Sequence, residues 1–99
     1  MEFKQLRRSS SQILKIAKKF RISRILVFGS VARGSATTQS DVDFLVEIEE
    51  GASLFGVAGF GYEVQELLGV PVDVIPVSVL PMVEDQEFVL NIQKDAIPL

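Results

Sequence analysis

The sequence GSVARG at residues 29–34 is followed, after a short polar segment, by SDVD at residues 40–43. An apolar run at residues 25–28 leads into the first motif, and a second apolar run directly follows the last acid. A short β-branched run that stops at a glycine is typical of a buried strand. The pattern therefore predicts strands at residues 25–28 and 42–48, joined by a short helix that begins at Ser30 and by a polar loop.

A helical pattern precedes the first strand. Apolar residues recur at three- and four-residue steps from Phe3 to Phe20, which predicts an amphipathic helix with a basic outer face. The helix begins either near residue 4 or, with a serine as its cap, near residue 10. A turn at residues 21–23 is expected to connect it to the strand.

A helix, a strand and another helix are expected after the second strand. The spacing over residues 52–68 predicts a helix, although three glycines favour an irregular first half and leave 62–68 as its regular part. Residues 70–74 predict a third strand, short or at a sheet edge because prolines lie near its two ends. Pro81 is expected to open the last helix, and residues 95–99 are expected to form a short tail.

A length of 99 residues has room for one small domain over residues 1–99, and a hydrophobic content of 47% indicates that it is globular. A dense core and an apolar patch for a partner both fit this content. The net charge of −3 argues against nucleic acid or an anionic membrane as a direct partner. All Lys and Arg except Lys94 lie at or before Arg33, and all acids except Glu2 lie after it. This asymmetry fits either one cationic wall of a cleft or a solvated basic helix.

The chain contains neither cysteine nor histidine. Disulfides, thiolate chemistry, zinc sites with Cys or His ligands and histidine general bases are therefore excluded. Any bound metal must be held by oxygen ligands, which favours Mg²⁺, Mn²⁺ or Ca²⁺. Because no signal segment and no long apolar run is present, we expect a soluble, cytoplasmic protein.

Three acids are candidates for holding such a metal. Asp41 and Asp43 lie two positions apart in the predicted strand, so they share one face with Cα atoms roughly 6–7 Å apart. Two anions this close repel each other unless a cation lies between them. Asp73 is the one acid inside the third predicted strand. If that strand lies beside the second, three carboxylates converge and form, with phosphate oxygens, a Mg²⁺ site of the kind that works with a nucleotide.

The turn at Gly29 and Ser30 is a candidate phosphate site. A strand that ends in Gly-Ser and turns into a helix presents backbone N–H groups to an anion, and glycine permits close approach to the main chain. The motif differs from both G-x-x-x-x-G-K-[ST] and G-x-G-x-x-G.

Together these groups predict phosphoryl or nucleotidyl transfer assisted by two metal ions. In the absence of histidine a carboxylate, with Asp73 preferred, takes the proton from the acceptor hydroxyl. Each motif alone has a simpler interpretation: a solvated strand face, an ordinary turn, or an ion pair of Asp73 with Arg24 or Arg33. Their joint occurrence, in this order and spacing, favours the catalytic interpretation.

The motifs resemble those of the minimal nucleotidyltransferases, the smallest branch of the DNA polymerase β-like nucleotidyltransferase superfamily. The residues that carry the resemblance are Gly29-Ser30-x-Ala32-Arg33-Gly34, Ser40-Asp41-x-Asp43 and Val72-Asp73-Val74. The resemblance implies an α/β fold of the α+β kind, with a small mixed sheet flanked by helices. The glycine-rich segment near residue 59 departs from the polar helix expected in this family.

The resemblance also implies roles for the site residues. Asp41 and Asp43 would be metal ligands, and Asp73 the third catalytic acid and ligand. The nucleotide-binding residues would be Gly29, Ser30, Arg33 and Ser40. Of these, Arg33 would either contact a phosphate or brace the loop. The cofactor would be Mg²⁺, as two ions, or Mn²⁺, and the substrate ATP.

The family further implies a partner, because its members commonly act as antitoxins of HEPN-domain toxins and some transfer AMP to a toxin tyrosine. We therefore expect a Mg²⁺-dependent adenylyltransferase that modifies and binds a partner toxin. A small-molecule nucleotidyltransferase of the aminoglycoside type, with its acceptor pocket completed in a homodimer, is one alternative. An antitoxin that acts by binding alone is the other.

Overall fold

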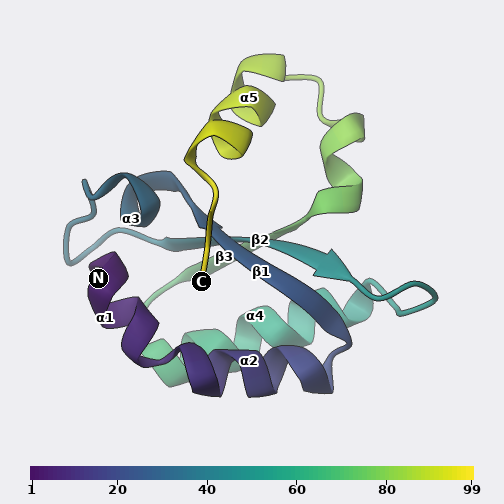
Figure 1. Cartoon of the computed structure of the whole chain (residues 1–99), viewed down its shortest axis with the longest axis horizontal. Helices are drawn as coiled ribbons and strands as arrows, with labels where there is room; N and C mark the ends of the chain where they lie inside the picture. The colour runs from purple at the N-terminus through teal and green to yellow at the C-terminus, as the bar shows by residue number, and fades with distance from the viewer.

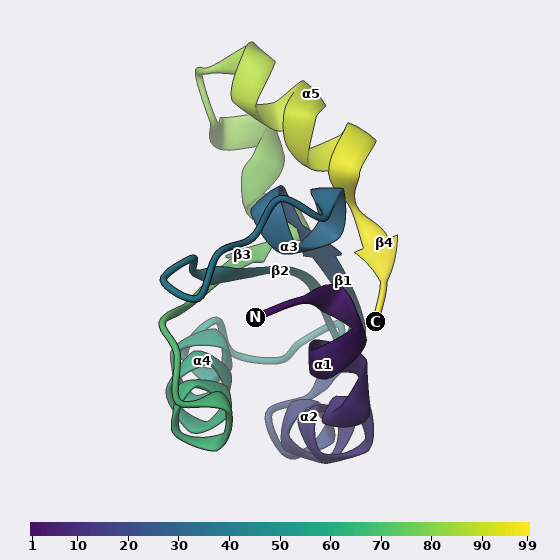
Figure 2. The same cartoon turned by 90° about the vertical axis from the view of Figure 1, so that its left-hand side faces the viewer.

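The computed structural model describes all 99 residues and has three layers, with a four-stranded sheet between two sets of helices (Figures 1 and 2). The strands are β1 (Ile22–Phe28), β2 (Val42–Ile48), β3 (Val72–Pro76) and β4 (Ile97–Pro98), in the order β3-β2-β1-β4. β2 pairs antiparallel with β1 and parallel with β3, and β4 pairs antiparallel with β1. The expected mixed sheet flanked by helices is thus confirmed.

The helices divide between the two faces of the sheet. One face carries α1 (Phe3–Arg8), α2 (Ser10–Lys19) and α4 (Phe55–Leu68). The other carries α3 (Gly29–Arg33), the 3₁₀ helix η1 (Val77–Met82) and α5 (Gln86–Asp95). None of these helices is long and apolar enough to cross a membrane.

Both faces of the sheet are packed, which explains the sequence of β2. Phe44 and Val46 are fully buried on the side of α2 and α4, where Phe44 meets Phe60 edge to face with ring centroids 5.9 Å apart. Leu45 is buried on the opposite side against Leu80. Because side chains alternate along a strand, a strand covered on both faces must carry consecutive apolar residues.

The start of the chain differs in detail from the expected single helix. Two helices, α1 and α2, meet at Ser9, which has φ −97° and ψ 6°. A helix therefore begins at each of the two positions that the sequence left open. β1 begins at Ile22 rather than at residue 25, because Ile22 is buried and pairs with Ile48. The turn accordingly lies earlier, at Arg21, which has φ 58°.

The glycine-rich half of α4 is a regular helix, contrary to the expected irregular segment. A Cβ atom at Gly59 would lie 2.5 and 2.8 Å from two carbons of the Phe20 ring, and one at Gly56 would lie 3.0 Å from the Phe20 carbonyl oxygen. The glycines thus allow α4 to pack directly against the end of α2. Close packing compensates for a helix propensity about 1 kcal/mol lower than that of alanine at each glycine.

Gly59→Ala is therefore expected to lower the free energy of unfolding by about 1–3 kcal/mol, because overpacking against Phe20 outweighs the gain in helix propensity. Urea unfolding followed by circular dichroism measures the change. In a Phe20→Ala background the same substitution should be neutral or stabilising, since the obstructing ring is gone. A stabilising effect of Gly59→Ala in the otherwise unchanged chain would contradict this account of the packing.

The C-terminal third differs most from the expectation. β3 spans Val72–Pro76 rather than 70–74, and it lies at the sheet edge as its prolines predict. Pro81 lies inside η1 and does not open α5. That helix begins after Asp85, whose carboxylate accepts a hydrogen bond of 3.1 Å from the Phe88 N–H, a normal N-terminal cap. The expected tail contains β4, which extends the sheet beside β1.

Candidate functional site

The register of three strands aligns the candidate residues across one end of the sheet. Asp43 lies opposite Phe28 of β1 and opposite Asp73 of β3. Gly29 directly follows Phe28, and Asp41 precedes β2 by one residue. Because neighbouring strands are about 4.8 Å apart, this register brings the Gly-Ser turn and the acids of two strands together.

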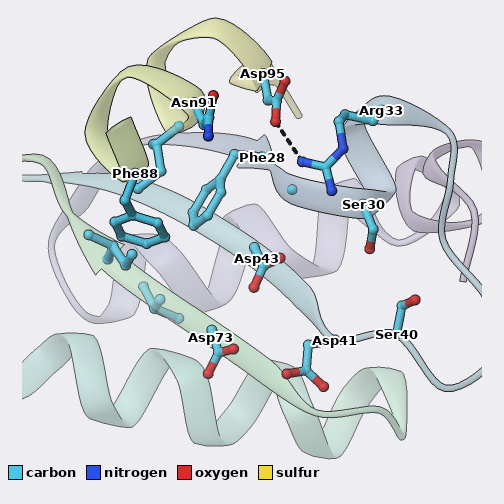
Figure 3. A pocket seen from close by; sticks show the side chains of 14 residues that line it. Phe28, Ser30, Arg33, Ser40, Asp41, Asp43, Asp73, Phe88, Asn91 and Asp95 are labelled. Carbon is cyan, nitrogen blue, oxygen red and sulfur yellow. Dashed lines mark hydrogen bonds and ion pairs between the residues drawn. The ribbon is translucent and has the colours of Figure 1, made fainter. Parts of the chain in front are cut away.

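A cavity of about 670 Å³ opens at this end of the sheet. All seven residues predicted from the sequence to bind the nucleotide and the metals line this cavity. Figure 3 shows Ser30, Ser40 and Asp41 on one side, Asp43 at the centre with Asp73 below it, and Phe88 and Asn91 of α5 on the other side. The two motifs and the third acid, separate in sequence, thus share one site.

Asp43 is the most perturbed acid in the chain. Its partial burial, and then the negative charges of Asp73 and Asp41, raise the pKa of Asp43 from 3.8 to about 6, while nearby Arg33 lowers it. Burial and like charge both disfavour the carboxylate, whereas a cation in the cavity would favour it. Neither ion pair that the sequence offered for Asp73 forms, since Arg24 pairs with Glu47 and Arg33 pairs with Asp95.

The donor chemistry of the three acids fits a hard divalent cation, because every side chain that can bind metal strongly here is a carboxylate. As the side chains stand, however, no group of three or more acidic residues is arranged to hold a metal ion. The acids converge on the cavity without forming a closed cage. Such an open arrangement leaves ligand positions for phosphate oxygens and water, as Mg²⁺ prefers.

The raised pKa of Asp43 predicts a pH dependence of stability in the metal-free protein. Between pH of about 4 and 6 the folded chain keeps a proton on Asp43 that the unfolded chain has lost, so the free energy of unfolding falls as the pH rises through this range. Asp43→Asn should remove this slope and should stabilise the protein at pH 7 by on the order of 2 kcal/mol, allowing for solvent screening. Thermal unfolding at pH 4 and pH 7 tests both statements. Equal stability of the two proteins at pH 7 would contradict them.

Gly29 begins α3 with φ 73°, a left-handed conformation that favours glycine. A Cβ atom at this position would collide with the Asp43 carboxylate. The backbone of the Gly29–Ser30 turn and the central acid are therefore in direct contact. This contact explains why a glycine is needed at the end of β1.

Arg33 and Ser40 line the cavity, but both already have partners within the protein. The Arg33 guanidinium donates to the Asp95 carboxylate at 2.7 Å, which links α3 to the end of α5. The Ser40 hydroxyl accepts a hydrogen bond of 2.9 Å from the Thr37 N–H. In this state Arg33 braces the loop, and contact of either residue with a nucleotide stays a prediction.

The wall that α5 contributes to the cavity is not predicted from the sequence. Phe88, Asn91 and Asp95 line it from this helix. They lie three and four residues apart, so they share one face of the helix. Their spacing is visible in the sequence, but which face of the helix lines the cavity depends on the packing of α5.

Asp73 also lines a second cavity, an apolar groove of about 580 Å³ between α4 and the β3 edge. The groove includes Leu54 and Tyr62, whose side chains are 60% and 67% exposed. Phe55, next to Leu54, is 89% exposed. Asp73 therefore lies where the acidic cavity and an apolar surface meet.

Comparison with known proteins places this geometry in a family. The model of the nucleotidyltransferase domain matches residues 10–97. The chain is 40% identical over 76 residues to MJ0435 of Methanocaldococcus jannaschii, provisionally named a protein adenylyltransferase, and the match covers 76% of this chain and 82% of that protein. It is also 40% identical over 65 residues to protein adenylyltransferase MntA of Thermococcus cleftensis, covering 66% of each.

Solved structures agree at the level of the fold. One provisionally described as a minimal nucleotidyltransferase matches with a TM-score of 0.78 and 34% identity, covering 100% of this chain and 97% of the other. A toxin–antitoxin structure with AMP-PNP matches with a TM-score of 0.59 and 18% identity, covering 86% and 82% of the two chains. From the family match, the sequence identities and the shared fold, we conclude that the chain belongs to the nucleotidyltransferase domain family and has the fold of a minimal nucleotidyltransferase.

Proposed function

We propose that this protein is a Mg²⁺-dependent adenylyltransferase that transfers AMP from ATP to a tyrosine hydroxyl of a partner HEPN-type toxin and acts as its antitoxin. The observation that carries the proposal is the position of Asp73, which lines both the acidic cavity and the apolar groove. A nucleotide in the cavity and an acceptor in the groove would meet at this carboxylate. Relatives named protein adenylyltransferase support the choice of AMP and of a protein acceptor.

The proposed reaction is a displacement at the α-phosphorus of ATP. The acceptor oxygen forms a bond to this phosphorus, the bond to the bridging oxygen breaks, and pyrophosphate leaves. Asp73 accepts the proton of the acceptor hydroxyl, because the chain has no histidine to do so. Asp41, Asp43 and Asp73 would hold the divalent cations, which supply charge neutralisation at the phosphate oxygens.

The Gly29–Ser30 turn would hold phosphates through its backbone N–H groups, which have no partner within the first turn of α3. Arg33 would add a positive charge at the same end of the cavity, after exchanging part of its contact with Asp95 for phosphate. Ser30 and Arg33 both line the cavity, and the Arg33 guanidinium lies beside Asp95 at the end of α5. Positioning and charge neutralisation are the main contributions a protein can make to phosphoryl transfer.

The antitoxin role is supported by the apolar surface and by the fold. A toxin–antitoxin complex crystallised with AMP-PNP, and another named MntA-HpeT, contain chains of this fold. In the present chain the groove beside Asp73 continues onto exposed side chains of α4. Exposed apolar surface next to a reactive site is typical of a protein-binding surface.

The experiment that tests the proposal incubates the protein with ATP labelled at the α-phosphate, Mg²⁺ and a HEPN-type toxin from the same organism. Label should move to the toxin, and mass spectrometry should find one or more AMP groups on tyrosine. Transfer to an amino sugar would support the small-molecule alternative instead. Co-purification of the two proteins without transfer would support an antitoxin that acts by binding alone.

A further inference from the structure

We propose that Phe88 and Asn91 of α5 form the base-binding subsite of the cavity and that this subsite selects adenine. The inference rests on the proposed nucleotide site and adds to it the residues that distinguish one nucleotide from another. Phosphate recognition is shared by all nucleoside triphosphates, so any preference among them must come from contacts to the base.

The two ends of the cavity differ in chemistry. The acids and the Gly29–Ser30 turn occupy one end and the centre, whereas Phe28, Phe88 and Asn91 lie together at the other end (Figure 3). A triphosphate with its cations belongs at the acidic end. The base, which is flat and largely apolar, then extends towards the aromatic end.

Phe88 provides an aromatic surface for stacking. It is 41% exposed, although Val89 and Ile92 of the same helix are 8% and 2% exposed in the core beneath. The apolar lining of the cavity also includes Phe28, which is 6% exposed, and Ile75. An aromatic ring left open in a polar cavity can stack with a base, and a purine offers the larger surface.

Asn91 provides a hydrogen-bonding group at the same end. Its carboxamide lines the cavity and makes no hydrogen bond within the protein, unlike Arg33 and Asp95, which bind each other. A carboxamide offers one donor and one acceptor side by side, and this pair matches the exocyclic amino group and an adjacent ring nitrogen of adenine.

The test measures the affinity of the full chain for ATP, GTP, CTP, UTP and inorganic tripolyphosphate by calorimetry in Mg²⁺. The unchanged protein should bind ATP more tightly than the other three nucleotides. Phe88→Ala should weaken nucleotide binding about tenfold or more and leave tripolyphosphate binding unchanged, and Phe88→Tyr should restore it. Asn91→Ala should reduce ATP affinity roughly 5- to 100-fold and so remove the preference for ATP.

Two residues of α5 outside the cavity provide matched controls. Leu90, which is 63% exposed, and Gln93, an exposed amide, should tolerate alanine without any change in affinity. If the four nucleotides bind equally and Phe88→Ala and Asn91→Ala behave like these controls, the subsite is wrong, even if labelled AMP still transfers. A preference for GTP would overturn the assignment to adenine. If neither nucleotides nor tripolyphosphate bind, the proposed function fails as well.

Discussion

Asp41→Asn and Asp43→Asn are each expected to lower the rate of AMP transfer about a thousandfold or more. Each substitution keeps the shape of the side chain but removes a negative charge from the cavity. A cation site that has lost one anionic ligand also loses several kcal/mol of stabilisation of the developing phosphate charge, and each 1.36 kcal/mol is a tenfold rate change. Steady-state release of pyrophosphate, measured with the partner protein present, reports the effect.

The same two variants separate catalysis from folding. Asp43→Asn should fold more stably than the unchanged protein at pH 7, since it relieves the burial and repulsion that raise the pKa of Asp43. Glu66→Gln, which neutralises an exposed acid on α4, should leave the rate unchanged. If transfer continues at a near-normal rate in Asp41→Asn and Asp43→Asn, the acids do not hold the catalytic metal and the proposed mechanism is wrong.

Gly29→Ala is expected to reduce transfer at least a hundredfold and to destabilise the fold. At φ 73° any L-residue is strained by about 1–2 kcal/mol. The added methyl group would also displace the Asp43 carboxylate, with which it collides. A misplacement of about 1 Å in a catalytic group can cost about a hundredfold in rate. Pyrophosphate release and chemical denaturation measure the two effects on the same protein sample.

Gly51→Ala is the matched control for this substitution. Gly51 has a similar φ of 80°, but a Cβ atom there would have no neighbour within 4 Å. Its replacement should therefore cost the same conformational strain and leave transfer unchanged. A loss of activity in Gly51→Ala equal to that in Gly29→Ala would mean that strain alone, and not contact with Asp43, explains the role of the glycine.

Much of the site could be predicted because its residues lie in short segments with unambiguous local signals. The apolar run before Gly29 and the alternation after Asp41 each indicate a strand. Once the two strands pair, Phe28 and Asp43 are opposite each other. The convergence of Asp73 with the other two acids required one further assumption, that the third strand lies beside the second. The parallel pairing of β2 with β3, in which Asp43 lies opposite Asp73, confirms it.

The α5 wall could not be predicted in the same way. The signal at Pro81 is typical of a helix start, yet the chain forms a 3₁₀ helix there and begins α5 only after Asp85. Helical spacing alone puts Phe88, Asn91 and Asp95 on one face, but only the packing of α5 shows that this face lines the cavity. The pairing of Arg33 with Asp95 was also beyond reach, because the two residues are 62 positions apart.

The glycines of α4 are a second case in which the sequence predicted the local structure wrongly, since the segment that they were expected to make irregular is a regular helix. Local propensity counts each as unfavourable in a helix. In the structure, Phe20 at the end of α2 packs directly against Gly56 and Gly59, where a side chain would collide with it. Tertiary packing therefore outweighed local preference, and the helix runs unbroken to Leu68.

By itself the sequence determined the strands around Gly29 and Asp43, the family, and the exclusion of histidine and cysteine chemistry. These depend on residue type and short-range order, which a linear pattern carries directly. Only the tertiary structure decided what faces the acids across the cavity, which partner Arg33 takes, and where the apolar groove meets Asp73. Those features depend on contacts between segments far apart in the chain, and the packing of the whole sheet sets their geometry.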